Sequence, residues 1–185
     1  MDWQDDGIVL SARRHGETSA IVTLLTRERG SHAGLIKGGF STHMRATIEP
    51  GNRVRATWRA RLSEHLGNFQ LESTHSTGAA LLDSPDRLAG MSAALALSAA
   101  ALPEREAHPA LYEVLGAFLD ALEHGDIREH AEGWGSLYVK WEVGLLQELG
   151  FRLDLDHCAA TGTTEDLIWV SPKSARAVSR EAGEP

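Results

Sequence analysis

The spacing of apolar residues along the chain changes near Gly78, from a period of two to a period of three to four. Before this point, short runs rich in β-branched residues are separated by polar turn segments, which is typical of strands. We predict five strands, at residues 7–13, 19–26, 31–37, 52–62 and 68–74. Five short strands joined by turns at this spacing indicate a small barrel or sandwich.

Beyond residue 78, apolar residues recur at helical spacing. We predict three helices, over residues 85–102, 109–124 and 135–149. Residues 154–170 show no regular pattern, and we expect a last helical segment to begin at Ser171-Pro172. The sequence therefore predicts an α+β chain of two domains, a β domain at 1–78 and an all-helical domain at 79–185.

The strand predicted at 52–62 alternates polar with apolar residues, so that one face carries Arg53, Arg55, Thr57, Arg59 and Arg61. Guanidinium groups match phosphate oxygens in geometry and charge. The row therefore predicts contacts to a nucleic-acid backbone. The alternative is a solvated strand face paired with glutamates. The nearest glutamates in sequence are Glu49, Glu64 and Glu72, which are too few to neutralise the row.

The stretch LIKGGFSTHMR, at residues 35–45, predicts a pliable loop after the third strand. Gly38 and Gly39 let the main chain bend and approach a ligand closely. We expect Lys37 and Arg45 to contact phosphates, with Arg13 and Arg14 as an extension of the same surface. Phe40 has two interpretations, a platform for stacking a base or a hydrophobic anchor of the loop.

Charge is distributed unevenly along the chain, whose formal net charge is −8. Residues 1–78 contain ten Lys/Arg and eight Asp/Glu, a net charge of +2, whereas residues 79–185 contain eight and eighteen, a net charge of −10. Such asymmetry favours a polyanionic partner for the first half.

Composition narrows the classes of protein and of metal site that the chain can belong to. Cys158 is the single cysteine, so the chain has no internal disulfide and too few thiols for a cysteine-rich zinc site. The acidic N-terminus lacks the apolar segment of a signal peptide, and no apolar run is long enough to span a bilayer. We expect a cytoplasmic protein without a bound cofactor.

An enzyme remains an alternative at this stage. The sequence contains no GxGxxG, GxxxxGK[ST] or HExxH motif. Its best acidic cluster would serve a metal-dependent nuclease and consists of Asp154, Asp156, His157 and Asp166. A cluster just after a helix-ending glycine is more often a solvated turn, so we expect no catalysis.

Two separated stretches resemble one known family. GIVLSARRHGETSAIVTLLTRERGSHAGLIKGG at residues 7–39, and LLQELGFRLDLDHCAATG followed by WVSPKSARAVS near the C-terminus, resemble the RecO family of DNA repair and recombination mediator proteins. The resemblance implies an N-terminal OB-fold followed by a helical domain. It also implies binding of single- and double-stranded DNA, annealing of complementary strands, and loading of a recombinase onto DNA coated by single-strand-binding protein. The implied partners are RecR and the acidic C-terminal tail of that single-strand-binding protein.

The chain departs from the family pattern at the zinc site that some relatives carry. Cys158 matches the first cysteine of that site, but Thr161 stands where the second would be, so no zinc is expected. Relatives usually continue past this point with further helix. For the acidic partner tail we choose Lys140 beside Trp141, with plain helix packing as the alternative. Because OB-folds also bind other oligonucleotides, an RNA-binding or translation-associated factor stays open.

Overall fold

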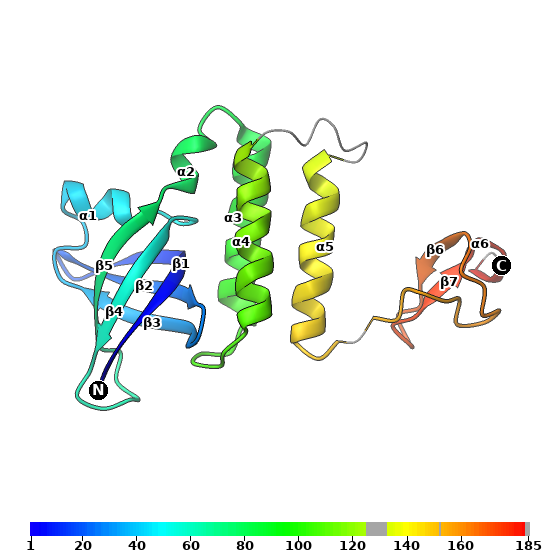
Figure 1. The fold of residues 1–185 in the computed structure, drawn as a ribbon, viewed down its shortest axis with the longest axis horizontal. Coiled ribbons are helices and arrows are strands. Elements are labelled where there is room, and N and C mark those ends of the chain that lie inside the picture. The colour runs from blue at the N-terminus through cyan, green and yellow to red at the C-terminus, as the bar shows by residue number, and fades with distance from the viewer. Residues whose placement is uncertain (125–132, 152, 184–185) are drawn as a thin grey trace. The chain divides into compact units, whose positions relative to one another are not determined.

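The computed structural model describes residues 1–124, 133–151 and 153–183. Five strands form a closed barrel at the N-terminus (Figure 1). They are β1 (Asp2–His15), β2 (Ser19–Thr26), β3 (Gly30–Ile36), β4 (Arg53–Arg59) and β5 (Asn68–His75). The order around the barrel is β1-β2-β3-β5-β4, and the pairing of β1 with β4 closes it. All pairs are antiparallel except β3–β5. The predicted five-stranded OB barrel is confirmed.

The alternation predicted for β4 is confirmed on its apolar side. Val54, Ala56 and Trp58 are buried in the barrel core. The indole Nε1 of Trp58 donates a hydrogen bond to the Leu66 carbonyl at 2.9 Å. At Gly67, which has a φ of +67°, a Cβ atom would lie 2.4 Å from the Trp58 ring, so this turn needs glycine. The residues of β4 and the turn that contains Gly67 therefore form one side of the barrel core.

The helical part begins with α2 (Thr77–Ala80), and three longer helices follow. They are α3 (Pro85–Ala101), α4 (Pro109–His124) and α5 (Gly133–Glu148). The three predicted helices are confirmed. The apolar stripe of α4 is fully buried, and both α3 and α4 contact strands of the barrel. The chain divides into two compact units, Met1–Glu142 and Val143–Pro185. The division into a domain at 1–78 and a domain at 79–185 stays a prediction.

The expected helix at Ser171-Pro172 is wrong. The structure has β6 (Leu167–Val170) before this point and β7 (Ala177–Ser179) after it, and the two strands pair antiparallel. Between them the Ser171 N–H donates to the Arg176 carbonyl at 2.9 Å, while Ala175 adopts a φ of +55°. A turn that reverses the chain therefore replaces the helix. The short helix α6 (Arg180–Gly183) follows, so the part of the chain predicted to be all-helical also contains a two-stranded sheet.

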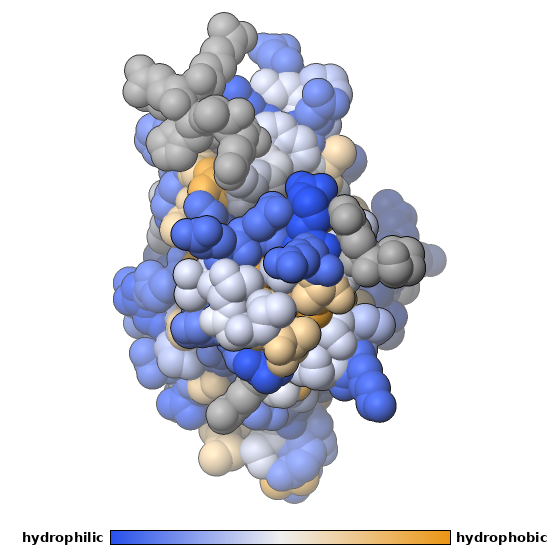
Figure 2. Space-filling view, turned by 90° about the vertical axis from the view of Figure 1, so that its right-hand side faces the viewer, coloured by the Kyte–Doolittle hydropathy of each residue, from blue (hydrophilic) through white to orange (hydrophobic). Residues whose placement is uncertain are grey.

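The surface carries few large apolar patches on the side seen in Figure 2. Hydrophilic side chains cover most of this view, and hydrophobic ones appear as small separate areas. Among the described helices, none is long and apolar enough to cross a membrane.

Four rings form a cluster in the barrel core, at Trp3, His32, Trp58 and Phe69. The rings of Trp3 and Trp58 stack at 5.7 Å, and His32 meets them edge-on at 5.0 and 4.9 Å. His32 is only 5% exposed. Burial, together with the smaller effects of the charges of Arg105 and Arg29, lowers the pKa of His32 to about 4. The imidazole is therefore neutral at physiological pH.

The buried His32 makes stability depend on pH. In the unfolded chain its pKa returns to about 6.5, so between pH 6.5 and 4 the unfolded state binds a proton that the folded state does not. The free energy of unfolding should therefore fall as pH is lowered through this window. We expect the parent to lose about 2 kcal/mol more between pH 7 and pH 4.5 than His32→Phe, measured by urea unfolding. Equal losses would contradict the lowered pKa.

Candidate nucleic-acid interface

Strand register brings the cations of β1 next to the turn that follows β3. Arg14 pairs with Ala20 of β2, and Ala20 pairs with Ile36, the last residue of β3. Lys37 follows directly. The turn lies flat on the barrel because Gly39 touches Ala20, where a Cβ atom on Gly39 would lie 2.5 Å from the Ala20 Cβ. The pairing of three adjacent strands therefore places Arg14 and Lys37 at the same end of the barrel.

The stretch at residues 35–45 is more ordered than predicted. Gly38, with a φ of +66°, turns the chain, and α1 (Thr42–Thr47) follows in place of a pliable loop. The Arg14 guanidinium lies over the Phe40 ring, 4.7 Å from its centre. Phe40 and Arg45, which is on α1, line the same cavity of about 710 Å³. Phe40 thus connects the cations of β1 with those of the turn and α1.

We call Arg13, Arg14, Lys37 and Arg45 the cationic patch. The contacts above connect Arg14, Lys37 and Arg45, whereas Arg13 is only the neighbour of Arg14 on β1, where successive side chains point to opposite faces. All four side chains are exposed. No carboxylate in the described part of the chain forms an ion pair with any of them. Solvated cations without carboxylate partners can exchange counterions for phosphate at little cost. The sequence had placed these residues together, but only the register and the Arg14–Phe40 contact show how.

The β4 arginines differ, because aspartates that the sequence did not indicate lie beside them. The Arg53 guanidinium donates to the Asp120 carboxylate at 2.6 Å and to the Gly116 carbonyl at 2.8 Å. Arg55 lies 2.9 Å from Asp6, and Arg59 lies 3.9 Å from Asp2. Asp2 and Asp6 reach the row because β1 pairs with β4 along its whole length. The row is therefore largely neutralised, although Arg55 and Arg59 stay exposed.

Arg61 does not belong to the row. It follows the end of β4 and is exposed, with no ion pair to the described residues. The predicted set of nucleic-acid contacts thus separates into an unpaired patch, a paired row on β4, and Arg61 alone. All eight positions stay predictions as contacts, but their electrostatic environments differ.

The two residues chosen for an acidic partner have opposite environments. Lys140 is exposed, whereas Trp141 is fully buried. Trp141 packs against Phe118 of α4 and Tyr138, with ring centres 6.3 and 5.6 Å apart. A partner can reach Lys140 directly, while Trp141 contributes to the contact between α4 and α5. As a partner-binding pair these residues stay a prediction.

The acidic residues near the C-terminus hold arginines. Asp154 accepts from Arg176 and Asp166 accepts from Arg180, both at 3.0 Å. Within the described ranges, no three His, Cys, Asp or Glu side chains gather as a metal site would require. Cys158 is buried, and its Sγ accepts hydrogen bonds from the N–H and hydroxyl of Ser179. The residues around the matching zinc position therefore form a hydrogen-bonded cluster and do not fit a zinc ion.

Comparisons with known proteins cover both regions of the chain. The family model described as "Recombination protein O N terminal" matches residues 1–77, and that described as "Recombination protein O C terminal" matches residues 82–185. The "DNA repair protein RecO" of Rhodospirillum centenum is 56% identical over 100% of this chain and 72% of its own length. The proteins of the same name from Phenylobacterium zucineum and Mesorhizobium japonicum are 51% and 49% identical, over 100% of this chain and 74% and 70% of theirs. The chain belongs to the RecO family of DNA repair proteins.

Proposed function

We propose that this chain is a non-catalytic DNA-binding mediator that contacts phosphates through the cationic patch. One observation carries the proposal. Arg14, Lys37 and Arg45 are exposed cations with no carboxylate partner among the described residues, and they lie around Phe40 on an OB barrel, in a chain whose net charge is −8. A local cationic surface on an acidic protein concentrates a polyanion at that surface.

The same surface suits annealing of complementary strands. Phosphate contacts carry little sequence preference, so strands of any sequence can bind. Neutralising the phosphates of two strands lowers their mutual repulsion. Phe40 is partly exposed beside the Arg14 guanidinium and offers an aromatic contact to an unpaired base. In this proposal the chain binds single- and double-stranded DNA, and it helps to load a recombinase onto DNA coated by single-strand-binding protein.

Protein partners form the second part of the proposal. Family membership favours RecR and the acidic tail of single-strand-binding protein as partners. Lys140 supplies an exposed cation on α5 for that tail. The unpaired Lys140 has no carboxylate within ion-pair distance in the described part of the chain, which leaves its charge available.

Annealing of two complementary oligonucleotides, labelled as an energy-transfer pair, tests the proposal. The parent should accelerate annealing, with and without a coat of single-strand-binding protein. Arg14→Ala/Lys37→Ala should be at least tenfold slower at the same protein concentration, because two phosphate contacts are lost. The matched control Arg55→Ala/Arg59→Ala removes two cations that are already paired and should anneal nearly as the parent does.

Two results would contradict the proposal. If the parent does not accelerate annealing, the mediator function is wrong. If RNA of the same sequence displaces the DNA at equal concentration while DNA cannot displace RNA, the chain is an RNA-binding factor and the DNA-binding function is wrong.

A further inference from the structure

A second hollow lies at the N-terminal end of β1 and shares no residue with the cationic patch. It has a volume of about 460 Å³, within the range of small-molecule sites. In Figure 1, α1 and the N-terminus lie well apart. The rings of Trp58 and His32 form its floor and are 2% and 5% exposed. Arg29 and Arg105 form its rim and are exposed.

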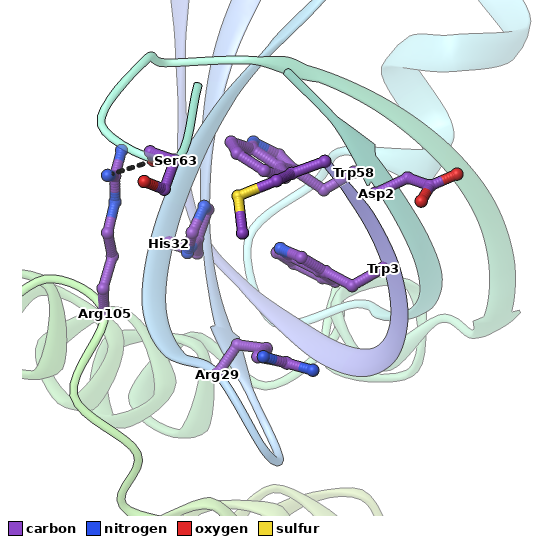
Figure 3. A pocket seen from close by; sticks show the side chains of 8 residues that line it. Asp2, Trp3, Arg29, His32, Trp58, Ser63 and Arg105 are labelled. Atoms are coloured by element: carbon purple, nitrogen blue, oxygen red, sulfur yellow. Dashed lines mark hydrogen bonds between the residues drawn. The ribbon is translucent and has the colours of Figure 1, made fainter. Parts of the chain in front are cut away.

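The floor contains a buried polar group without a partner. Neither ring nitrogen of His32 has a hydrogen-bond partner among the described residues. A neutral imidazole offers one N–H donor and one bare nitrogen acceptor. Leaving both unpaired in a buried site costs free energy that a ligand can recover. Figure 3 shows the His32 ring and the Trp3 ring facing the same hollow.

The rim is positive because neither of its two guanidinium groups forms an ion pair with a carboxylate in the described structure, although Arg105 also acts electrostatically on Glu64. Arg105 donates to the carbonyl of Ser63, as drawn in Figure 3, and to that of His65 at 3.1 Å. Carbonyl oxygens carry no net charge, so the charge of Arg105 persists. The carboxylate of Asp2 is directed away from the rings in Figure 3 and lies 3.9 Å from Arg59.

Backbone geometry builds this site into the fold. Arg105 has a φ of 64°, a left-handed conformation that is unfavourable for a residue with a side chain. Its N–H donates to the Ser31 carbonyl at 2.7 Å, which ties the segment after α3 to the start of β3. This bond holds the guanidinium beside the residues that follow β4. Strain of this kind concentrates at functional sites.

We propose that this pocket binds one nucleotide of single-stranded DNA, with the base against Trp3 and His32 and the phosphate against Arg29 and Arg105. The inference deepens the proposed function and rests on it. Trp3 is the partly exposed member of the ring cluster and offers an aromatic surface to the base. The edge of a nucleobase carries neighbouring donors and acceptors, which match the donor and acceptor of a neutral His32.

An acidic peptide is the competing ligand, since its carboxylate would also satisfy the arginines. An acidic peptide would satisfy the unpaired nitrogens of His32 less well than a nucleotide would. A carboxylate only accepts hydrogen bonds, so it would leave the bare nitrogen of His32 unpaired. Because the pKa of His32 is about 4, the ring does not become a second donor at neutral pH. The combination of a neutral donor–acceptor floor and a cationic rim therefore favours a nucleotide.

The test titrates the full chain with deoxyadenosine 5′-monophosphate and with deoxyribose 5-phosphate, which lacks the base. NMR follows the indole N–H of Trp3 and the imidazole of His32. We expect the nucleotide to shift both signals and to bind at least tenfold more tightly than the sugar phosphate. His32→Phe should weaken nucleotide binding at least tenfold. Arg29→Ala, an exposed change that leaves the core intact, should do the same, whereas the control Lys173→Ala, which removes an exposed cation that does not line the pocket, should bind as the parent does.

The outcomes separate this pocket from the cationic patch. If the nucleotide leaves both signals unchanged while long single-stranded DNA still binds, the pocket assignment is overturned and the proposed function stands. Nucleotide binding that Arg14→Ala/Lys37→Ala leaves intact, while the same variant loses long DNA, supports two distinct sites. Should an acidic peptide with a free C-terminus shift the signals where the nucleotide does not, the ligand class is overturned.

Discussion

Replacing Arg13, Arg14, Lys37 and Arg45 together with alanine is expected to weaken binding of single-stranded DNA on the order of 100-fold at low salt. The reason is the loss of four exposed cations that have no carboxylate partner in the described structure. Fluorescence anisotropy of a labelled oligonucleotide measures the change.

A fold control accompanies this variant. The four side chains lie at the surface, so the midpoint of thermal unfolding should stay close to that of the parent. Binding that persists at parental affinity, with the fold intact, would show that the patch does not contact phosphate.

Gly30→Ala is expected to destabilise the first unit by more than about 3 kcal/mol. A Cβ atom at this position would lie 1.7 Å from the Glu106 carbonyl oxygen, and the φ of +68° is unfavourable for alanine. Both the backbone of the segment after α3 and the start of β3 would have to move. Urea unfolding measures the loss.

Gly16→Ala is the matched control for this prediction. Gly16 has a similar φ of +62°, but a Cβ atom there would meet nothing within 4 Å. The control should therefore lose only about 1 kcal/mol, the cost of the left-handed backbone. Equal losses for the two variants would mean that the contact with Glu106 does not matter.

Local patterns predicted much of the fold from the sequence. The period-two run at 52–62 identified Val54 and Trp58 as the buried side of β4, and proline and glycine marked the ends of the helices. These signals depend only on neighbouring residues. The turn at Ser171-Pro172 was mistaken for a helix start, because pairing of β6 with β7 overrides the preference of Pro172 for the first helical turn.

The charge state of the β4 row could not be predicted in the same way. Its partners Asp2, Asp6 and Asp120 are far from it in sequence, and strand register or helix packing brings them close. One signal was available. Trp3 continues the apolar pattern of β1 towards the N-terminus, and extending the strand there would have placed Asp2 and Asp6 opposite Arg59 and Arg55.

The pocket at His32 carried even less sequence signal. A single histidine within an apolar strand is most often a core residue with satisfied hydrogen bonds. Its significance comes from the absence of a partner within the described structure and from Arg105, which a left-handed backbone brings from beyond α3. Neither feature can be recognised from a motif of neighbouring residues.

The most direct test of where DNA binds is a salt series of anisotropy titrations on two matched double variants. Log affinity against log salt should flatten by about 1.4 for Arg14→Ala/Lys37→Ala, about 0.7 for each lost phosphate contact on a single strand. For Arg55→Ala/Arg59→Ala, whose cations already lie beside Asp6 and Asp2, the slope should change by much less. A flattened slope for the second variant and an unchanged one for the first would place the DNA on β4 and contradict the assignment to the cationic patch.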